Sequence, residues 1–191
     1  MTTTAFATRV AIIASGVALT LMAAPVQAHA DEQAPLFALV DAAAARLQTA
    51  DAVAASKWTT GGAIEDPARE QQVIDAVIAA ASDRGVVPGY VAKAFRDQID
   101  ATVGVQYERF SEWKLDPSAA PTTAPNLSDS RAAIDALNRT MVSEIAEQWD
   151  SLHSPACLAE LDDATNAVVV ARGLDGVYPR ALSFATRSYC L

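Results

Sequence analysis

Apolar residues recur every three or four positions along most of the chain, which is the period of a helix that packs on one face. Proline and glycine residues at the ends of these stretches favour helix boundaries. We predict helices over residues 33–58, 67–84, 88–114, 128–152, 155–171 and 174–188. No strand pattern or internal repeat is present in the sequence. The pattern therefore predicts an all-α, single-domain bundle of about six helices, three of them long.

The N-terminal segment has a different character from the rest of the chain. Arg9 precedes an apolar run over residues 10–24, and the sequence AHA ending at Ala30 is typical of a signal-peptidase site. The run is short for a membrane span, although an uncleaved anchor is the alternative interpretation. We expect a signal peptide over residues 1–30 and a helical domain over 31–191 that is secreted or periplasmic.

The charge of the mature chain restricts its partners. Removal of Arg9 leaves 13 of the 14 basic residues against 23 acidic ones, a net charge of about −10. Such an acidic body should repel nucleic acid and anionic lipid, so we expect no nucleic-acid partner and no membrane association after cleavage. If the protein binds an anion, a local cluster of cations must overcome this overall field.

The cysteine and histidine content restricts the chemistry. Cys157 and Cys190 are an even pair in a chain that we expect to be exported, and they predict one disulfide in the C-terminal section. His153 is the one histidine left after cleavage. This inventory argues against a metal site and against a histidine-based triad, and no glycine-rich nucleotide loop is present. Any reaction must depend on arginine, lysine, carboxylates and amides.

Cations occupy positions that should be apolar in the first predicted helix. Its inward stripe consists of Leu39, Ala43, Arg46, Ala50, Val53 and Lys57. Arg46 and Lys57 are eleven residues apart, which is about three turns, so they point the same way about 16 Å apart along the helix. This helix therefore directs two positive charges toward its neighbours.

Three other predicted helices also carry polar or charged residues on faces that should be apolar. Thr102 and Gln106 are neighbours one turn apart within a large apolar face. Arg131 lies at one end of the apolar stripe of helix 128–152. A third group of polar residues shares one face at the start of helix 67–84: Asp66, Arg69 and Glu70.

Each of these residues alone has a simple structural explanation. Arg46 could extend its charge past the edge of a core, and Asp66 could be an N-cap. Thr102 and Gln106 could form a hydrogen-bonded pair between helices. Together, however, the residues would bury more positive than negative charge, which is costly without a counter-charge. The combination therefore predicts a pocket for a small dianion.

The same residues resemble a known family. The signal peptide, the segments AARLQTADAVAASKW, IEDPARE, RDQIDATVGVQYERFSEWKLDP and SDSRAAIDALN, and the late cysteine pair resemble exported (gamma-subclass) all-helical AroQ-type chorismate mutases. The resemblance covers nearly all of the mature chain. It implies conversion of chorismate to prephenate by a Claisen rearrangement, without metal or cofactor. Such a reaction requires a compact substrate conformer and stabilisation of the negative charge that develops on the ether oxygen.

The resemblance also implies roles for individual residues. Lys57 and Gln106 would donate to the ether oxygen, and Arg46 and Arg131 would bind the two carboxylates. Four residues would complete the substrate site: Asp66, Arg69, Glu70 and Thr102. Among these, Glu70 would accept a hydrogen bond from the ring hydroxyl.

The resemblance implies that each subunit carries a complete site. In intracellular members the second carboxylate arginine comes from a partner chain, whereas here Arg131 would replace it from within. We therefore expect a homodimer in which neither site depends on the other subunit.

Two alternatives to an enzyme stay open at this point. The chain could be a non-catalytic exported protein that binds a small anion or a protein partner, or an alanine-rich structural bundle. A binder has little need for donors at a breaking ether bond, so the presence of both Lys57 and Gln106 favours the enzyme. A structural bundle would leave the inward cations unexplained.

Overall fold

The structure is a computed structural model that describes residues 1, 2 and 34–190. The chain divides into two units, residues 1–32 and 33–191, and the description below concerns the second. Apart from its first two residues, the predicted signal peptide lies outside the described residues.

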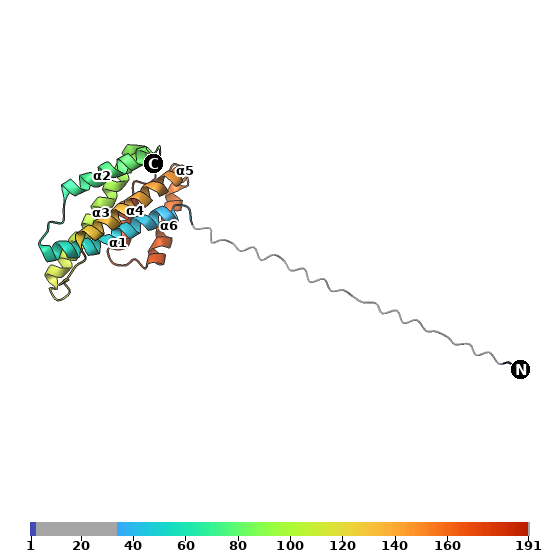
Figure 1. Ribbon diagram of the computed structural model, residues 1–191, viewed down its shortest axis with the longest axis horizontal. Helices are drawn as coiled ribbons and strands as arrows, with labels where there is room; N and C mark the ends of the chain where they lie inside the picture. Colours follow the sequence, from blue (N-terminus) through green and yellow to red (C-terminus); the bar gives the residue numbers. More distant parts are fainter. Residues whose placement is uncertain (3–33, 191) are drawn as a thin grey trace. The chain divides into compact units, whose positions relative to one another are not determined.

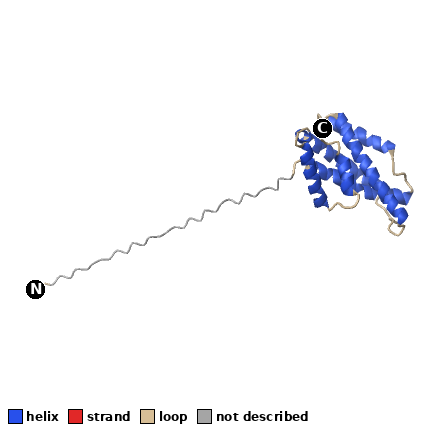
Figure 2. Cartoon of the chain, turned by 180° about the vertical axis from the view of Figure 1, so that it is seen from behind, coloured by secondary structure: helices blue, strands red, loops and turns tan. Residues whose placement is uncertain are grey.

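The described part of the second unit consists of helices and loops, without strands (Figures 1 and 2). Its elements are α1 (Phe37–Thr60), α2 (Pro67–Ser82), α3 (Pro88–Leu115), α4 (Leu127–Glu147), α5 (Trp149–Leu152), α6 (Cys157–Arg172) and α7 (Tyr178–Thr186). The all-α prediction is confirmed. None of these helices is long and apolar enough to cross a membrane.

Local signals in the sequence account for the junction between α1 and α2. α1 ends at Gly61, whose φ of 69° lies in the left-handed region that favours glycine. α2 begins with Pro67 in its first turn, after Asp66. The carboxylate of Asp66 accepts a hydrogen bond from the backbone N–H of Arg69 at 3.1 Å, so the predicted N-cap is confirmed.

The helix predicted over 128–152 differs from the observed structure in two ways. It divides into α4 and α5 at Gln148, whose φ of −97° and ψ of 14° depart from helical geometry. Its start was predicted at Ser128, whereas α4 begins at Leu127 with Asn126 as the N-cap, whose side chain accepts from the backbone N–H of Ser128 at 2.9 Å. The apolar period continues across the break through Trp149 and Leu152, so the sequence pattern does not reveal it.

α1 is the central helix, because it packs against α3, α4, α6 and α7 (Figure 1). Its inward stripe is buried from Leu39 to Val53, with Arg46 only 3% exposed, whereas Lys57 at its end is half-buried. A cation therefore lies inside the bundle, where α1, α3 and α4 meet.

The C-terminal section is covalently closed. Cys157, at the start of α6, and Cys190, after α7, form a disulfide, which confirms the predicted pairing. The neighbouring Tyr189 is fully buried, and its backbone carbonyl accepts a hydrogen bond from the Tyr90 hydroxyl of α3 at 2.6 Å. These links fasten the end of the described chain against the bundle.

Candidate active site

A pocket opens between α1, α2, α3 and α4 and encloses about 600 Å³, including the space at its mouth. All eight residues that the sequence predicted for the site line it: Arg46, Lys57, Asp66, Arg69, Glu70, Thr102, Gln106 and Arg131. The rest of the lining is apolar: Val53, Ile64, Val73, Ile99, Val103, Leu127 and Ile134. The pocket thus combines an apolar lining with a small number of polar side chains, as small-molecule sites do.

Arg46 is held rigidly at the base of the site. Its Nε donates to the side-chain oxygen of Asn138 at 2.7 Å, and one terminal nitrogen donates to the hydroxyl of Thr102 at 3.2 Å. Burial lowers the pKa of Arg46 to about 10, because the charged form loses contact with water. The guanidinium therefore remains protonated at neutral pH.

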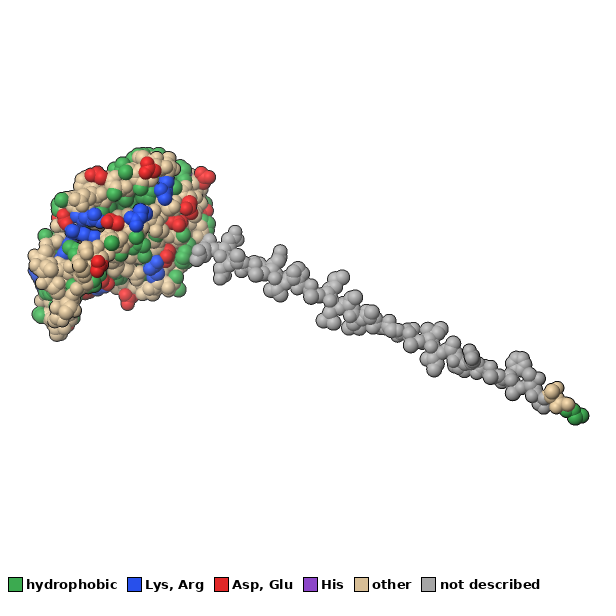
Figure 3. Space-filling view, in the orientation of Figure 1, with side chains coloured by type: hydrophobic (Ala, Val, Ile, Leu, Met, Phe, Trp, Pro, Cys, Tyr) green, Lys and Arg blue, Asp and Glu red, His purple; other side chains and the backbone are tan. Residues whose placement is uncertain are grey.

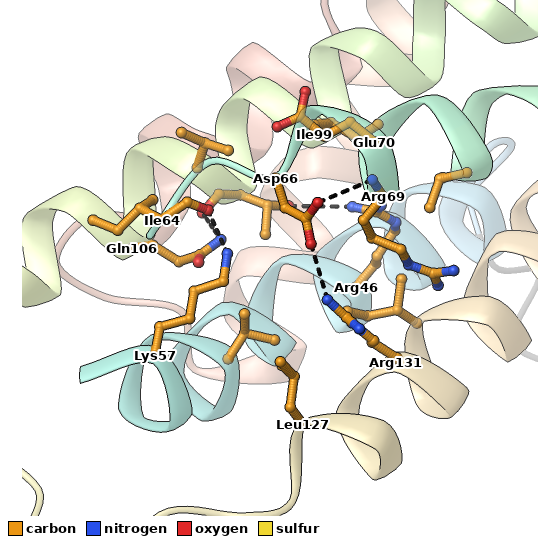
Figure 4. A pocket seen from close by; sticks show the side chains of 15 residues that line it. Arg46, Lys57, Ile64, Asp66, Arg69, Glu70, Ile99, Gln106, Leu127 and Arg131 are labelled. Atoms are coloured by element: carbon orange, nitrogen blue, oxygen red, sulfur yellow. Dashed lines mark hydrogen bonds and ion pairs between the residues drawn. The ribbon is translucent and has the colours of Figure 1, made fainter. Parts of the chain in front are cut away.

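Lys57 and Gln106 point toward each other from α1 and α3 (Figure 4). The ammonium group of Lys57 donates to the backbone carbonyl of Ile64 in the loop before α2. Burial lowers the pKa of Lys57, although the nearby carboxylate of Asp66 opposes this shift. Two hydrogen-bond donors therefore meet across the pocket.

Gln106 is 3% exposed and has spare hydrogen-bonding capacity. Its amide nitrogen donates to the carbonyl of Thr102 in its own helix at 3.3 Å. Its side-chain oxygen is buried without a partner among the described residues. One amide hydrogen is left for a ligand, because the amide group has two.

The two carboxylates at the start of α2 each form an ion pair with an arginine of a neighbouring helix. Asp66 accepts from a terminal nitrogen of Arg131 at 3.0 Å, in addition to capping α2 (Figure 4). Glu70 accepts from Arg96 of α3 at 3.0 Å. The two acidic residues are thus fixed on one side of the pocket.

Sequence reasoning missed three partners of the site residues. Asp135 accepts from Arg69 at 2.5 Å, Asn138 holds Arg46, and Arg96 holds Glu70. Asp135 lies one turn after Arg131, and that spacing was an available signal. The contact of Arg96 was not predictable, because it depends on how α3 packs against α2.

The pocket carries a surplus of positive charge. Four cationic side chains and two carboxylates line it, which leaves two positive charges. On the face seen in Figure 3, several Lys and Arg side chains lie close together with acidic side chains beside them, although the chain as a whole is acidic. A bound dianion would balance this charge and gain charge-assisted hydrogen bonds.

The lining suits binding and electrostatic stabilisation rather than covalent chemistry. No histidine, cysteine or serine lines the pocket. The described residues contain no group of three or more His, Cys, Asp or Glu side chains that could hold a metal ion. The arrangement can orient an anion and donate hydrogen bonds to an oxygen on which charge develops.

Comparison with known proteins gives a consistent picture at the level of sequence. A family model described as chorismate mutase type II matches residues 37–107. The secreted chorismate mutase of Mycolicibacterium smegmatis is 62% identical over 163 residues, which cover 85% of this chain and 90% of the relative. The secreted chorismate mutase of Mycobacterium tuberculosis is 47% identical over 180 residues, which cover 93% and 90%.

Solved structures agree with this picture. A chorismate mutase from Burkholderia phymatum superimposes with a TM-score of 0.78 and 31% identity, over 83% of this chain and 98% of the other. One from Burkholderia thailandensis gives a TM-score of 0.77 and 28% identity, over 82% and 99%. The similarity therefore extends over nearly the whole length of both solved chains.

Proposed function

Because this chain belongs to the family of secreted chorismate mutases, we propose that its pocket converts chorismate to prephenate with the residue roles set out below. The chain is an isomerase of this family, and its substrate is chorismate. The observation that carries the residue assignment is the convergence of Arg46, Lys57 and Gln106 in one pocket with two surplus positive charges.

Substrate positioning depends on the arginines. Arg46 and Arg131 each bind one carboxylate, which holds chorismate in the compact conformer that brings the reacting carbon atoms together. Arg69 adds positive charge to the same wall. Because Asp66 holds Arg131 and Asp135 holds Arg69, these side chains are oriented before the substrate arrives.

Lys57 and Gln106 accelerate the bond-breaking step. As the carbon–oxygen bond of the ether breaks, negative charge develops on the oxygen, and both side chains donate hydrogen bonds to it. Donors that are already in place stabilise the transition state more than the ground state, and this difference raises kcat.

The remaining residues of the site hold the ring hydroxyl and support the carboxylate-binding end. Glu70 accepts a hydrogen bond from the ring hydroxyl near the backbone of Asp66, and Arg96 keeps the Glu70 carboxylate in place. Thr102 supports the carboxylate-binding end, because its hydroxyl contacts Arg46. The apolar residues of the lining exclude water around the ring.

We place the protein outside the cytoplasm, as the names of its curated relatives state for those proteins. The signal peptide predicted over residues 1–30 would direct export. We also propose a homodimer, which the family resemblance implies. Each subunit would hold one complete site, because one chain supplies every side chain of the proposed mechanism.

The direct test is to add chorismate to the purified mature chain and follow its ultraviolet absorbance, with prephenate identified as the product. Lys57→Ala should lower kcat by about a hundredfold or more, the usual effect of removing a transition-state donor. Arg84→Ala is the control, because Arg84 is exposed and does not line the pocket. Equal losses in the two variants would refute the role of Lys57.

A further inference from the structure

The three arginines of the pocket fall into two classes according to what holds them. Arg69 forms an ion pair with Asp135 at 2.5 Å, and Arg131 forms one with Asp66 at 3.0 Å. Arg46, by contrast, has no carboxylate oxygen within ion-pairing distance among the residues that the structure describes. Its charge is therefore the least compensated of the three arginines.

Uncharged oxygens hold Arg46 instead. The side-chain oxygen of Asn138 accepts from Nε at 2.7 Å, and the hydroxyl of Thr102 accepts from a terminal nitrogen at 3.2 Å. All three side chains are buried, with exposed fractions of 3% for Arg46, 5% for Asn138 and 8% for Thr102. A guanidinium has five N–H donors, so about three remain for a ligand.

Asn138 does not line the substrate pocket. It lies on α4, two turns after Arg131, and borders an adjoining groove between α2 and α4 that shares Arg69 and Val73 with the pocket. Among the described residues, Arg46 is the one lining residue to which the Asn138 side chain is hydrogen-bonded. We therefore expect an effect of Asn138 on the reaction to pass through Arg46.

We propose that Asn138 is a positioning residue, which fixes the Arg46 guanidinium while leaving its positive charge for a substrate carboxylate. This inference rests on the proposed function. An aspartate here would have almost the same shape and could accept the same hydrogen bond, but it would neutralise Arg46 before the substrate arrives. The neutral amide is thus matched to a site that must attract a dianion.

The decisive variant is Asn138→Asp, because it keeps the geometry and changes the charge. We expect KM for chorismate to rise by about tenfold or more, with a smaller change in kcat, because carboxylate binding is common to the ground and transition states. The melting temperature should not fall, because the new carboxylate gives a buried arginine a counter-charge. Asn166→Asp, on the exposed face of α6, is the matched control and should leave KM unchanged.

A double-mutant cycle tests whether the effect passes through Arg46. Asn138→Ala should raise KM in the wild-type background, whereas in an Arg46→Ala background it should add little. Circular dichroism and melting temperatures of all four proteins show whether each one is folded. An equal effect of Asn138→Ala in both backgrounds would overturn the proposal.

The outcomes separate this inference from the proposed function. If the wild-type chain converts no chorismate, the proposed function fails and the inference fails with it. If the wild type is active and Asn138→Asp leaves KM within about twofold, which is less than 0.5 kcal/mol, only the inference fails. A raised KM accompanied by a lower melting temperature would indicate a merely structural residue and would also overturn it.

Discussion

In the proposed mechanism, Gln106 sets the pH range in which the ether oxygen can receive a hydrogen bond. A glutamate at this position would have to be protonated to donate. Glutamine donates at any pH. Lys57 would impose the upper limit, because burial lowers the pKa of its ammonium group and the deprotonated amine carries no positive charge.

We expect kcat/KM to vary little between about pH 6 and 8.5 and to decline at higher pH as Lys57 loses its proton. Gln106→Glu should convert this plateau into a steady loss of activity as pH rises, because the new carboxyl group ionises and can no longer donate. Both profiles can be measured by chorismate depletion in buffers of constant ionic strength. A steep loss above pH 6 in the wild type would contradict the role of Gln106.

The first turn of α2 combines a structural role with a role in the site. Asp66 caps the helix through the backbone N–H of Arg69 and also holds the side chain of Arg131. A single carboxylate therefore ties the start of α2 to α4 across the pocket. The stability of this element and the orientation of Arg131, which we propose to bind a substrate carboxylate, depend on the same residue.

The two roles of Asp66 can be separated by substitution. Asp66→Asn should retain the cap, because asparagine is as good an N-cap as aspartate, whereas Asp66→Ala should lower the free energy of unfolding by about 1 kcal/mol. Urea denaturation of the purified variants measures both. Asp83→Ala, at the exposed C-terminal end of α2, is the control and should not destabilise the protein, because a negative charge there is unfavourable. Equal destabilisation by both substitutions at Asp66 would mean that the cap is not the stabilising interaction.

At the scale of the described molecule, the candidate active-site pocket and the C-terminal section are distinct. α1 to α4, with the loop before α2, provide the lining residues, whereas α6 and α7 contribute none. The disulfide between Cys157 and Cys190 joins residues 33 positions apart and constrains the section that packs behind α1 and α3. We therefore expect the disulfide to affect stability much more than chemistry.

Replacing both cysteines by serine should lower the free energy of unfolding by about 2–4 kcal/mol, because the unfolded chain gains conformational freedom. At a temperature where the variant is still folded, its kcat should remain close to that of the wild type. Urea unfolding and chorismate turnover of the same preparation test the two statements together. Unchanged stability, or a large loss of kcat in the folded variant, would show that the section has a different role.

Much of the architecture followed from the apolar pattern, because helical period and capping residues act over a few neighbouring positions. The bounds of α2 and α3 were predicted within two residues, whereas the break at Gln148 and the Asn126 cap were not. Those two features depend on local backbone geometry that leaves the apolar period intact.

The sequence by itself determined which side chains face inward, because positions three and four apart in a helix share a face. It thereby identified the eight polar residues that line the pocket. Tertiary structure alone decided how their charges are held, because residues such as Arg46 and Asn138, 92 positions apart, meet only when α1 packs against α4. The distinction between a compensated and an uncompensated cation is a property of that packing, and no local pattern along the chain encodes it.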